Sequence, residues 1–523
     1  MSQISEVLNL CQNIVTTVGK TKVTNSKTLS EILTIDNIPY WEVFSSELST
    51  RYFPAAYKSA DSFDNLTNSI KPYLVNLKNF ILDKNFIKKN ESNEFSTNFS
   101  TRILCLEFMP QQSRDVMQPV VKALCKAKDV DVLILRDGIY NADYEQASLN
   151  LSIKSIWSFW NKDLEILSKQ TKKYFKSIRK EINKKNILEK SNCTDDLNFM
   201  KRIQRAINRF FFGEFGSLIR RGVISKSVIE KYKPSLLITT DINDPRTRIY
   251  MLLCKRLGIP CLNLQHGLTN SMAIEWKFFP ADKVVVWGDY FKKILISHGI
   301  SKNSIYVSGA PRSDILHSLK SNDPFLLKKQ LGIPKNAPTV LLASTFTLGS
   351  YDQLNNDHKI LIDMKKTIFD IVNKLENIYL IVKPHPEENE TQTKNLVESN
   401  DRIIYLDKKK DIKPYTNMCD CFLSFGSTTT IDAILLNKLV ICPAFPGWIW
   451  SDTCIDTEVV YAAHSYDKIF DILHKVSIFK HQKLIHSLEL NKKKFISNWF
   501  YKFDGKSSNR ISQIALDMIR KAK

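Results

Sequence analysis

The strongest constraint on the fold is a repeated alternation of short apolar runs with amphipathic stretches of helical length. Between residues 233 and 314 the apolar runs are "PSLLITT", "IPCLNL", "KVVVWG" and "IYVSG", and polar residues follow each of them. Short runs that are apolar throughout are typical of strands buried on both faces of a parallel sheet. The alternation therefore predicts an α/β protein built from β/α units with right-handed crossovers.

A second series of β/α units follows this one, and a shorter unit precedes it. Residues 337–443 contain the apolar runs "TVLLA", "IYLIV", "RIIYL" and "CFLSF", again with polar residues at their ends. Residues 101–108 and 130–135 read as strands with a helix between them. This first unit lacks the Gly-x-Gly-x-x-Gly pattern, so no dinucleotide cofactor is predicted. The sequence thus predicts two Rossmann-like domains.

The chain of 523 residues is too long for one ordinary domain. We expect residues 1–100 to form a mainly helical extension and residues 101–310 to form the first Rossmann-like domain. A basic helical insertion at about 145–232 interrupts that domain. Residues 311–490 should form the second Rossmann-like domain, and residues 491–523 should be helices that partly cross back to the first.

The composition is that of a globular protein with a strong positive charge. The net charge is +21, which predicts attraction to polyanions such as nucleic acid, an anionic membrane surface or phosphorylated substrates. No run of arginine, glycine and aromatic residues suited to base stacking is present, so nucleic acid is not expected as a partner. The basic insertion is either a solvated helical face or a surface that docks on anionic lipid or on a polyanionic acceptor.

The N-terminal sequence and the cysteines bear on the cellular compartment. The first 20 residues lack the pattern of a signal peptide, and no apolar run approaches the length of about 20 residues needed to cross a bilayer. The pair Cys419 and Cys421 has no second pair at zinc-ligand spacing, and ten scattered cysteines fit reduced thiols. We therefore expect a cytoplasmic protein, peripheral on the inner face of the cell membrane.

Short motifs at predicted strand ends resemble those of a known superfamily. The motifs, in chain order, are "QHG" (265–267), "SGAPRSD" (308–314), "ASTFT" (343–347), "KPHP" (383–386) and "SFGSTTTIDA" (424–433). Their order resembles the GT-B superfamily, in particular bacterial surface-polysaccharide glycosyltransferases and CDP-glycerol glycerophosphotransferases of teichoic acid synthesis. Capsule polysialyltransferases also carry a His-Pro motif and a Ser/Thr motif. The resemblance covers about residues 101–144 and 233–490, and it implies two Rossmann-like domains facing across a cleft.

The resemblance makes the second domain the one that binds the nucleotide-activated donor. His385 lies between two prolines and can donate a hydrogen bond to a leaving phosphate. The glycine-led Ser/Thr run offers N–H groups and hydroxyls to an anion, although a helix cap alone would explain one hydroxyl. For the segment around Gly309 a plain linker turn is the alternative. The predicted donor-binding residues are His385, Lys383, Gly426, Ser427, Thr428, Thr429, Ser344, Thr345, Gly309 and Arg312.

The first domain should supply a base that deprotonates the acceptor hydroxyl. Asp241 is the first acid after an apolar run and is the predicted base, whereas Asp244, just before a proline, should cap the following helix. His266 is the alternative base, unless it binds the backbone in a buried turn. Asp137 is a further candidate, because polysialyltransferases carry an acidic pair before a glycine. No Asp-x-Asp motif stands in a metal-binding context, so no metal and no cofactor are expected.

These observations predict an enzyme that transfers a sugar from a nucleotide-activated donor to a cell-surface polysaccharide or glycolipid acceptor. The transfer should be inverting and independent of metal. Three alternatives remain open at this point. They are glycerophosphate transfer from a CDP-alditol, 2-epimerisation of a nucleotide sugar, and a non-catalytic basic membrane-binding protein on a transferase scaffold.

Overall fold

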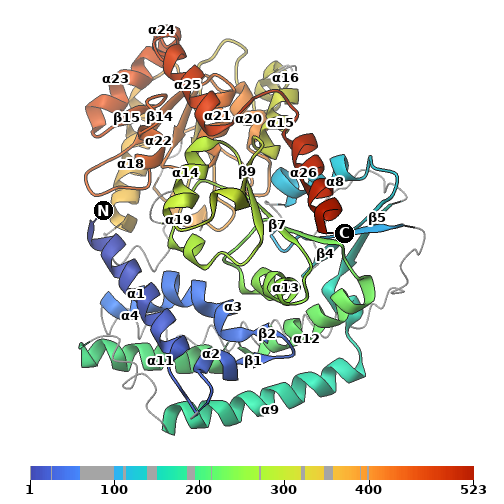
Figure 1. Cartoon of the computed structure of the whole chain (residues 1–523). Helices are drawn as coiled ribbons and strands as arrows, with labels where there is room; N and C mark the ends of the chain where they lie inside the picture. The colour runs from blue at the N-terminus through green and yellow to red at the C-terminus, as the bar shows by residue number, and fades with distance from the viewer. Residues whose placement is uncertain are drawn as a thin grey trace. The chain divides into compact units, whose positions relative to one another are not determined.

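The computed structural model divides the chain into two compact units (Figure 1). Unit 1 comprises Met1–Val286, Phe291–Pro311 and Ser508–Lys523, and unit 2 comprises Trp287–Tyr290 and Arg312–Ser507. The structure describes residues 2–24, 26–58, 99–109, 113–137, 150–184, 195–213, 215–269, 273–319, 324–346, 357–388, 390–396 and 400–522. Residues 59–98 of the predicted helical extension lie outside these ranges.

The core of unit 1 is a seven-stranded sheet whose neighbouring strands are all parallel, in the order β5-β4-β3-β6-β7-β8-β9. The strands are β3 (Thr101–Leu106), β4 (Val130–Arg136), β5 (Leu151–Ser155), β6 (Leu236–Thr239), β7 (Cys261–Leu264), β8 (Lys283–Val286) and β9 (Ile305–Val307). The direction of the strand order reverses between β3 and β6. In open sheets of this kind, ligands bind beyond the carboxyl ends of the strands at such a switch point.

Helices cover this sheet and complete its core. They include α8 (Gln118–Leu124), α13 (Pro245–Arg256), α14 (Asp289–Ser297) and α26 (Ser507–Ala522). The C-terminal helix α26 places Ile511, Ala515 and Ile519 in one apolar cluster with residues of β3, β4 and α8. Helix α13 ends where the sequence predicts, because Gly258 follows it with φ of 71°, a conformation that glycine adopts without strain.

The predicted helical insertion begins with a strand rather than a helix. Residues 151–155 pair in parallel with β4 and form the edge strand β5, and only residues 156–159 turn helically, as η3. The residues of β5 are intermediate in burial, apart from the exposed Ile153, so β5 lacks the continuous apolar run that marks the central strands. An edge strand buries less side chain than a central strand, which is why the sequence pattern did not reveal it.

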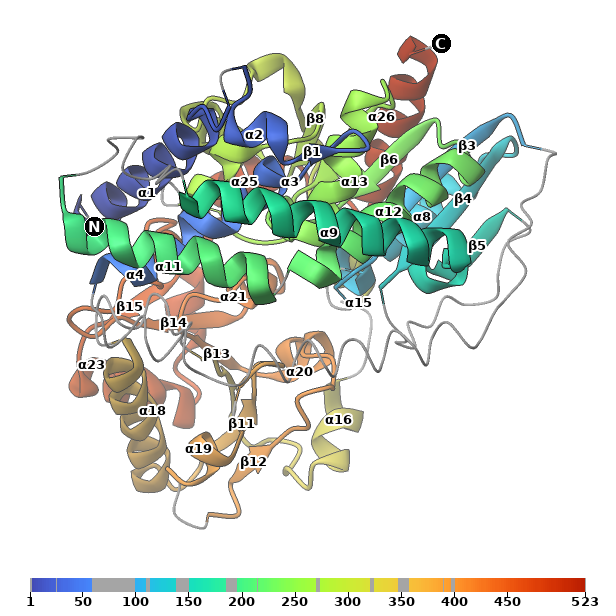
Figure 2. The same cartoon turned by 90° about the horizontal axis from the view of Figure 1, so that it is seen from below.

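The N-terminal segment and the insertion pack together in unit 1. Figure 2 shows α9, α11 and α12 running beside the N-terminal helices. Tyr40 meets Phe175 of α9 edge to face, with ring centroids 5.2 Å apart. The elements of this layer are α1 (Ser2–Lys20), α2 (Leu29–Ile32), β1 (Thr34–Ile35), β2 (Ile38–Pro39), α3 (Tyr40–Glu47), η1 (Leu48–Tyr52), α4 (Phe53–Lys58), η3 (Ile156–Phe159), α9 (Lys162–Lys184), α11 (Leu197–Gly213) and α12 (Phe215–Tyr232). Short helical turns elsewhere in unit 1 are η2 (Ser113–Met117), η4 (Ile274–Phe278) and η5 (Lys302–Ser304).

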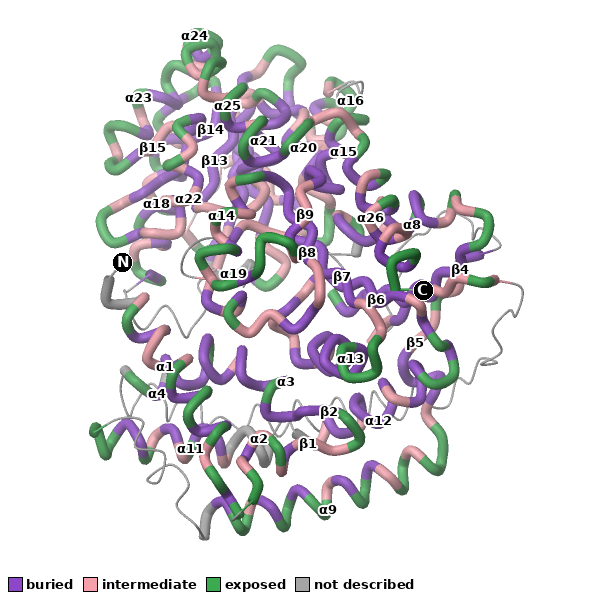
Figure 3. The backbone as a smooth tube through the Cα atoms, viewed as in Figure 1, coloured by how far each residue is buried: buried purple, intermediate pink, exposed green. Residues whose placement is uncertain are grey.

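Helix α9 is amphipathic along its length. Its buried positions recur every three or four residues, at Ser168, Thr171, Phe175, Ile178 and Ile182. The opposite face is exposed and carries most of its lysines. Figure 3 shows buried and exposed residues alternating along α9. This spacing is that of a helix packed by one face.

None of the described helices has an apolar stretch long enough to span a membrane.

Unit 2 contains a six-stranded parallel sheet in the order β12-β11-β10-β13-β14-β15. The strands are β10 (Thr339–Ala343), β11 (Tyr379–Lys383), β12 (Ile403–Tyr405), β13 (Cys421–Ser424), β14 (Leu439–Pro443) and β15 (Tyr461–Ala463). The order again reverses once, here between β10 and β13, so unit 2 has its own switch point. Both sheets have the Rossmann strand order.

The helices of unit 2 pack on the buried faces of this sheet. Helices α18 and α23 supply Ile368, Val372, Ile469 and Leu473 to a cluster with the central strands. The helices are α15 (Pro311–Leu319), α16 (Pro324–Gln330), α18 (Asp357–Lys374), α19 (Glu390–Lys394), α20 (Lys413–Met418), α21 (Thr429–Leu435), α22 (Asp452–Ile455), α23 (Tyr466–Ser477), α24 (Gln482–His486) and α25 (Glu489–Trp499). The predicted α/β class with two Rossmann-like domains is confirmed.

Candidate functional site

The predicted donor-binding residues of unit 2 gather around its switch point. Ser344 and Thr345 follow β10, and Gly426 and Ser427 follow β13, the two strands between which the order reverses. His385 follows β11, the neighbour of β10. The sequence predicted these positions from motifs at strand ends, and the sheet order brings them to one edge.

The turn after β11 fixes the imidazole of His385. The backbone N–H of Glu388 donates to the carbonyl of His385 at 2.9 Å and closes a turn over Pro386. The N–H of Glu387 donates to Nδ1 of His385 at 3.2 Å, and a carboxylate oxygen of Glu388 accepts the N–H of His385 at 3.0 Å. Because Nδ1 accepts a hydrogen bond, the neutral ring carries its proton on Nε2.

The surroundings of His385 favour the neutral ring. Burial lowers the pKa of His385, and the charge of Lys383 lowers it further, while Glu387 and Glu388 act in the opposite direction. The ring also lies against Phe346, with centroids 4.8 Å apart. No described residue bonds to Nε2, so this N–H can donate to a ligand.

Lys383 and Ser344 bond within the protein rather than standing open at the edge. The buried Lys383 Nζ donates to the carbonyls of Pro384 and Lys408, both at 2.9 Å. The hydroxyl of Ser344 donates to the Glu388 carboxylate at 2.8 Å. These contacts make both side chains supports of the two loops. Direct phosphate binding by them stays a prediction.

The Ser/Thr run after β13 bonds mainly to itself. Ser424 Oγ accepts from the N–H of Ser427 at 3.2 Å and from the hydroxyl of Thr430 at 2.7 Å. Ser427 Oγ in turn accepts from the N–H and the hydroxyl of Thr429, at 3.3 and 3.1 Å. Thr428 is the residue before helix α21 but its side chain makes no capping bond. The hydroxyls thus shape this loop, and phosphate binding by the run stays a prediction.

Gly426 is required by a neighbouring loop. Its φ is 101°, and a Cβ atom there would lie 1.9 Å from the carbonyl oxygen of Trp450 and 3.0 Å from the nitrogen of Ser451. Only glycine allows two backbones to approach so closely. The loop after β14 therefore explains this glycine without a ligand.

Arg312 and Gly309 lie on either side of the junction between the units. Arg312, in unit 2, is buried and its Nη2 donates to Asp432 of α21 at 2.5 Å. Gly309, in unit 1, follows β9 with φ of 85°, and its carbonyl accepts the hydroxyl of Ser308. The ion pair gives Arg312 a structural partner within unit 2, so its predicted phosphate contact finds no direct support.

In unit 1, His266 follows β7 with its side chain exposed. Its Nδ1 lies 2.6 Å from the carbonyl oxygen of Thr240 at the end of β6. A carbonyl oxygen only accepts, so Nδ1 carries the proton and Nε2 of the neutral ring holds a lone pair. No described residue bonds to Nε2. The ring is therefore arranged as a proton acceptor.

Asp241 and Asp244 shape the loop between β6 and α13. The Oδ1 atom of Asp241 accepts the N–H groups of Asn243 and Asp244, at 2.7 and 3.1 Å. Asp244 caps α13, because its side chain accepts the N–H of Arg246 at 2.8 Å, and its predicted role is confirmed. Asp241 thus has a loop-forming role, and the catalytic role that the sequence predicts for it stays a prediction.

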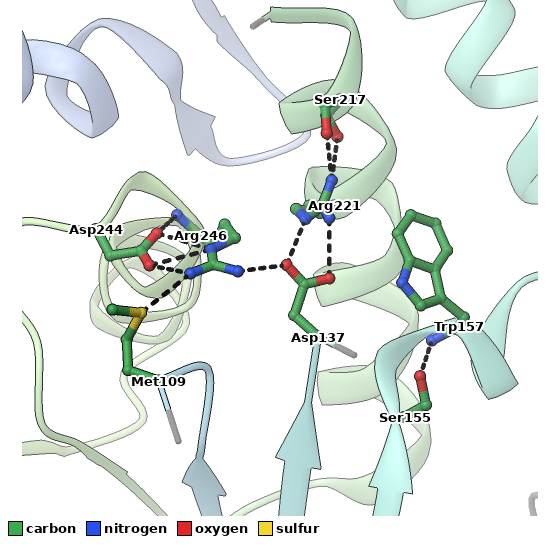
Figure 4. Close-up of polar contacts among 8 residues, drawn as sticks. All are labelled: Met109, Asp137, Ser155, Trp157, Ser217, Arg221, Asp244 and Arg246. Atoms are coloured by element: carbon green, nitrogen blue, oxygen red, sulfur yellow. Dashed lines mark hydrogen bonds and ion pairs between the residues drawn. The ribbon is translucent and has the colours of Figure 1, made fainter. Parts of the chain in front are cut away.

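Asp137, a candidate base in the sequence, is held by two arginines. Figure 4 shows its carboxylate between Arg221 of α12 and Arg246 of α13. Arg221 donates to both oxygens, at 2.8 and 3.0 Å, and Arg246 donates to one of them at 3.0 Å. The Asp137 side chain is 1% exposed. The bonds to two arginines give this buried carboxylate a structural role, and its predicted role as a base finds no direct support.

The same cluster ties the insertion to the edge of the sheet. Arg246 also binds the capping residue Asp244, with its Nη2 2.6 Å from the carboxylate. Arg221 lies over the ring of Trp157, 5.2 Å from its centroid, as Figure 4 also shows. One buried carboxylate, Asp137, therefore links α12 to the loop that carries Asp241.

Sequence reasoning missed Glu275, in η4. Burial raises its pKa to about 7, its own backbone N–H acts in the opposite direction, and Asp241 raises it further. A carboxyl group with a pKa near neutrality is a candidate for proton transfer. The signal in the sequence is an acid inside the apolar run "AIEWKFF".

Among the described residues, no three His, Cys, Asp or Glu side chains lie close enough together to hold a metal ion.

Comparison with known structures gives the fold. The S. aureus MnaA–UDP complex superposes with a TM-score of 0.52 at 13% identity, covering 80% of this chain and 98% of that chain. The UDP-GlcNAc 2-epimerase from Neisseria meningitidis bound to UDP-GlcNAc gives 0.50 at 15% identity, covering 80% and 100%. At such low identity these likenesses concern the fold alone, and they confirm the predicted GT-B architecture.

Comparison of the sequence gives the family. No curated protein sequence matches the chain. A family model does match, over residues 255–516, which is half of the chain and runs from the end of α13 into α26. It describes the CDP-glycerol:poly(glycerophosphate) glycerophosphotransferases. This protein is therefore an enzyme of the GT-B type that belongs to the CDP-glycerol:poly(glycerophosphate) glycerophosphotransferase family.

Proposed function

We propose that the protein transfers glycerophosphate, or a closely related alditol phosphate, from a CDP-activated donor to a hydroxyl group of a cell-surface polymer. The observation that carries this proposal is His385, whose Nε2–H is fixed by a turn at the switch point of unit 2. A neutral donor at that edge suits a phosphate oxygen. The family match supports the CDP-linked donor.

In the proposed reaction the acceptor oxygen attacks the phosphorus that bears the glycerol. The phosphoanhydride bond breaks and CMP leaves with the electron pair of that bond. His385 donates a hydrogen bond from Nε2 to the phosphate oxygens of the leaving CMP, where negative charge increases. The acceptor hydroxyl loses its proton to a base of unit 1.

We propose His266 as that base, in place of Asp241. The Thr240 carbonyl holds the proton of His266 on Nδ1 and leaves Nε2 to accept one. Asp241 already accepts two backbone N–H groups with one oxygen. These two bonds give the Asp241 carboxylate a structural role in its own loop.

Sugar transfer from a nucleotide-activated donor is the second candidate. The matched range begins at residue 255, so the loop with Asp241 lies outside it. The half of the chain that should contact the acceptor can therefore differ from the family, and with it the group that is transferred.

The proposed acceptor is a polymer or lipid-linked chain at an anionic membrane surface. A net charge of +21 favours both an anionic membrane and an anionic polymer. The exposed lysines of α9 support the membrane partner, because they form the outer face of a helix packed by its other side.

The test is a panel of UDP-, GDP-, CMP- and CDP-linked donors, each with and without a polymer acceptor, analysed by mass spectrometry. Release of CMP from CDP-glycerol together with growth of the acceptor supports the proposal. Release of a nucleoside diphosphate from a sugar donor would support the second candidate. Isomerisation of UDP-GlcNAc without acceptor, or no turnover of any donor, would overturn both.

A further inference from the structure

The carboxylate of Glu388 collects hydrogen bonds from four segments of unit 2. One oxygen accepts from Lys365 Nζ at 2.6 Å, from the hydroxyl of Ser344 at 2.8 Å and from that of Thr393 at 2.5 Å. The other oxygen accepts the backbone N–H of His385 at 3.0 Å. A single side chain therefore joins the ends of β10 and β11 to helices α18 and α19.

Glu388 and Lys365 form a buried ion pair. Both side chains are 4% exposed. Removing two charges from water costs several kcal/mol for each ion, and such pairs often stabilise a fold no better than apolar residues of similar size. Stability alone is thus a weak reason for this pair, and its place at the edge that carries His385 points to a role in the site.

The contacts of Glu388 and His385 are reciprocal. The carbonyl of His385 accepts the N–H of Glu388 at 2.9 Å, while the carboxylate of Glu388 accepts the N–H of His385 at 3.0 Å. The same reciprocity fixes the first turn of a helix in a capping box. Here the two bonds hold the turn in which the N–H of Glu387 donates to Nδ1 of His385, and so they fix the ring.

The same ion pair holds residues 344–346, the described start of the loop after β10. Lys365 Nζ donates to the carbonyl oxygen of Thr345 at 2.9 Å, next to Ser344, whose hydroxyl binds Glu388. The loop that follows β10 and the turn that follows β11 therefore share one anchor. Movement of Glu388 would displace both together.

We propose that Glu388 and Lys365 are positioning residues of the donor site, which hold His385 as the Nε2–H tautomer and fix the β10 loop beside it. The effect on turnover rests on the proposed function. The effect on the tautomer does not, because it concerns the protein without substrate.

The test uses protein labelled with 15N histidine, whose NMR shifts distinguish the two tautomers, together with steady-state kinetics. Glu388→Gln should convert the single Nε2–H form of His385 into a mixture. It should lower kcat by roughly a hundredfold, the cost of misplacing a catalytic group by about 1 Å, while KM for the donor changes little. The control is Asp370→Asn, which breaks an exposed ion pair with Lys374 on the same helix as Lys365 and should change neither.

A second variant guards against unfolding, since Glu388→Gln leaves Lys365 buried without its partner. The double variant Glu388→Gln/Lys365→Met removes both charges and should fold, again with a mixed tautomer and low kcat. A single Nε2–H form with wild-type kcat in either folded variant overturns the inference, and so does unfolding of both variants, which would make the pair purely structural. If the wild-type protein turns over no donor, but Glu388→Gln still changes the tautomer of His385, the proposed function is rejected and this inference stands.

Discussion

Two histidines at strand ends are held in opposite tautomers by backbone groups. His385 accepts an N–H at Nδ1 and so presents a proton at Nε2, whereas His266 donates from Nδ1 to a carbonyl and so presents a lone pair. A donor for a leaving group and an acceptor for a hydroxyl proton are the two groups that the proposed transfer requires. Both roles are those of neutral imidazole rings, so neither histidine has to be charged.

The tautomer of His385 leads to a prediction with two substitutions. Asparagine can keep the acceptor near Nδ1 but has no donor at the position of Nε2, while glutamine can place an N–H there. We expect His385→Asn to lower kcat by about 100- to 1000-fold, the cost of one lost oxyanion donor, and His385→Gln to lower it less. Thermal unfolding should show both variants folded. Equal kcat in the two variants would remove the donor role.

A second prediction separates the two candidate bases. His266→Asn keeps a donor for the Thr240 carbonyl but loses the acceptor, so turnover should fall by about a hundredfold or more. In Asp241→Asn the amide oxygen can still accept the two backbone N–H groups, and turnover should fall by less than about tenfold. His486→Asn, at an exposed position of unit 2, is the control. The reverse order of losses would make Asp241 the base.

Glu275 should make the stability depend on pH. Its pKa is about 7 in the folded protein and near 4.5 when unfolded, so the folded state keeps a proton that the unfolded state releases between these values. Stability is therefore lost as pH rises through about 7, and Glu275→Gln should remove that loss. The difference in unfolding free energy between variant and wild type should shift in favour of the variant by on the order of 2 kcal/mol from about pH 5 to pH 8. Denaturant unfolding at the two pH values measures this shift.

The control for this measurement is Glu230→Gln, which changes an exposed carboxyl of α12 in the same unit. Its unfolding free energy should follow the wild type at both pH values. A Glu275→Gln variant whose stability keeps the wild-type pH dependence would show that another group causes it.

The positions of the site were predictable from the sequence, but the roles of many residues were not. Apolar runs that end in polar residues located His385, His266 and Ser344 at strand ends, because chain order fixes where a strand stops. Their hydrogen bonds depend on residues distant in sequence. Lys365 stands 23 residues before its partner Glu388, and nothing in the sequence pairs them. Likewise, nothing in the sequence pairs Asp137 with Arg221 and Arg246, which lie 84 and 109 residues after it.

At the scale of elements, burial decided what the sequence could reveal. Central strands such as β10 and β13 are buried along their whole length and read as continuous apolar runs. The edge strand β5 is only partly buried and was missed. The cap Asp244 was predicted, because capping depends on residues next to one another in the chain.

One buried arginine of α13 attaches the N-terminal segment to the loop beside the proposed base. Arg248 is 2% exposed and donates to the carbonyl oxygens of Glu42, Val43, Ile242 and Phe278, at 2.8 to 3.0 Å. Burial lowers its pKa to about 10, while nearby carboxylates raise it, so the side chain remains charged at neutral pH. Helix α3 is therefore part of the support of unit 1 and not an appendage.

This contact predicts a large loss of stability in Arg248→Met. Four carbonyl groups would stay buried without their donor, at a cost of at least about 3 kcal/mol in the free energy of unfolding. Arg256→Met is the matched control, because Arg256 lies on the same helix but is partly exposed. Its one ion pair is long, with 3.7 Å between its Nη2 and the Glu42 carboxylate. Urea unfolding of both variants gives the difference. An Arg248→Met variant as stable as its control would show that α3 packs independently of this arginine.

At the scale of the whole molecule, the excess of positive charge supports the anionic partner proposed above. A net charge of +21 is present on a chain whose described helices include none able to span a membrane. In the part of the chain that the structure describes, Lys173, Lys176 and Lys180 lie on the exposed side of α9. The other side of this helix packs on the rest of unit 1. Helix packing thus orders these charges on one surface, where their attractions to an anionic membrane add.

The final prediction concerns this surface. Lysines near an anionic membrane contribute about 1 kcal/mol each, so replacing Lys173, Lys176 and Lys180 by Gln should weaken binding to phosphatidylserine vesicles by roughly a hundredfold. Salt should weaken wild-type binding steeply, because exposed charges are screened within about 8 Å at physiological ionic strength. A control with Lys293, Lys302 and Lys329 replaced by Gln loses the same charge at exposed positions elsewhere. Equal losses in the two triple variants would make net charge, and not α9, responsible for membrane binding.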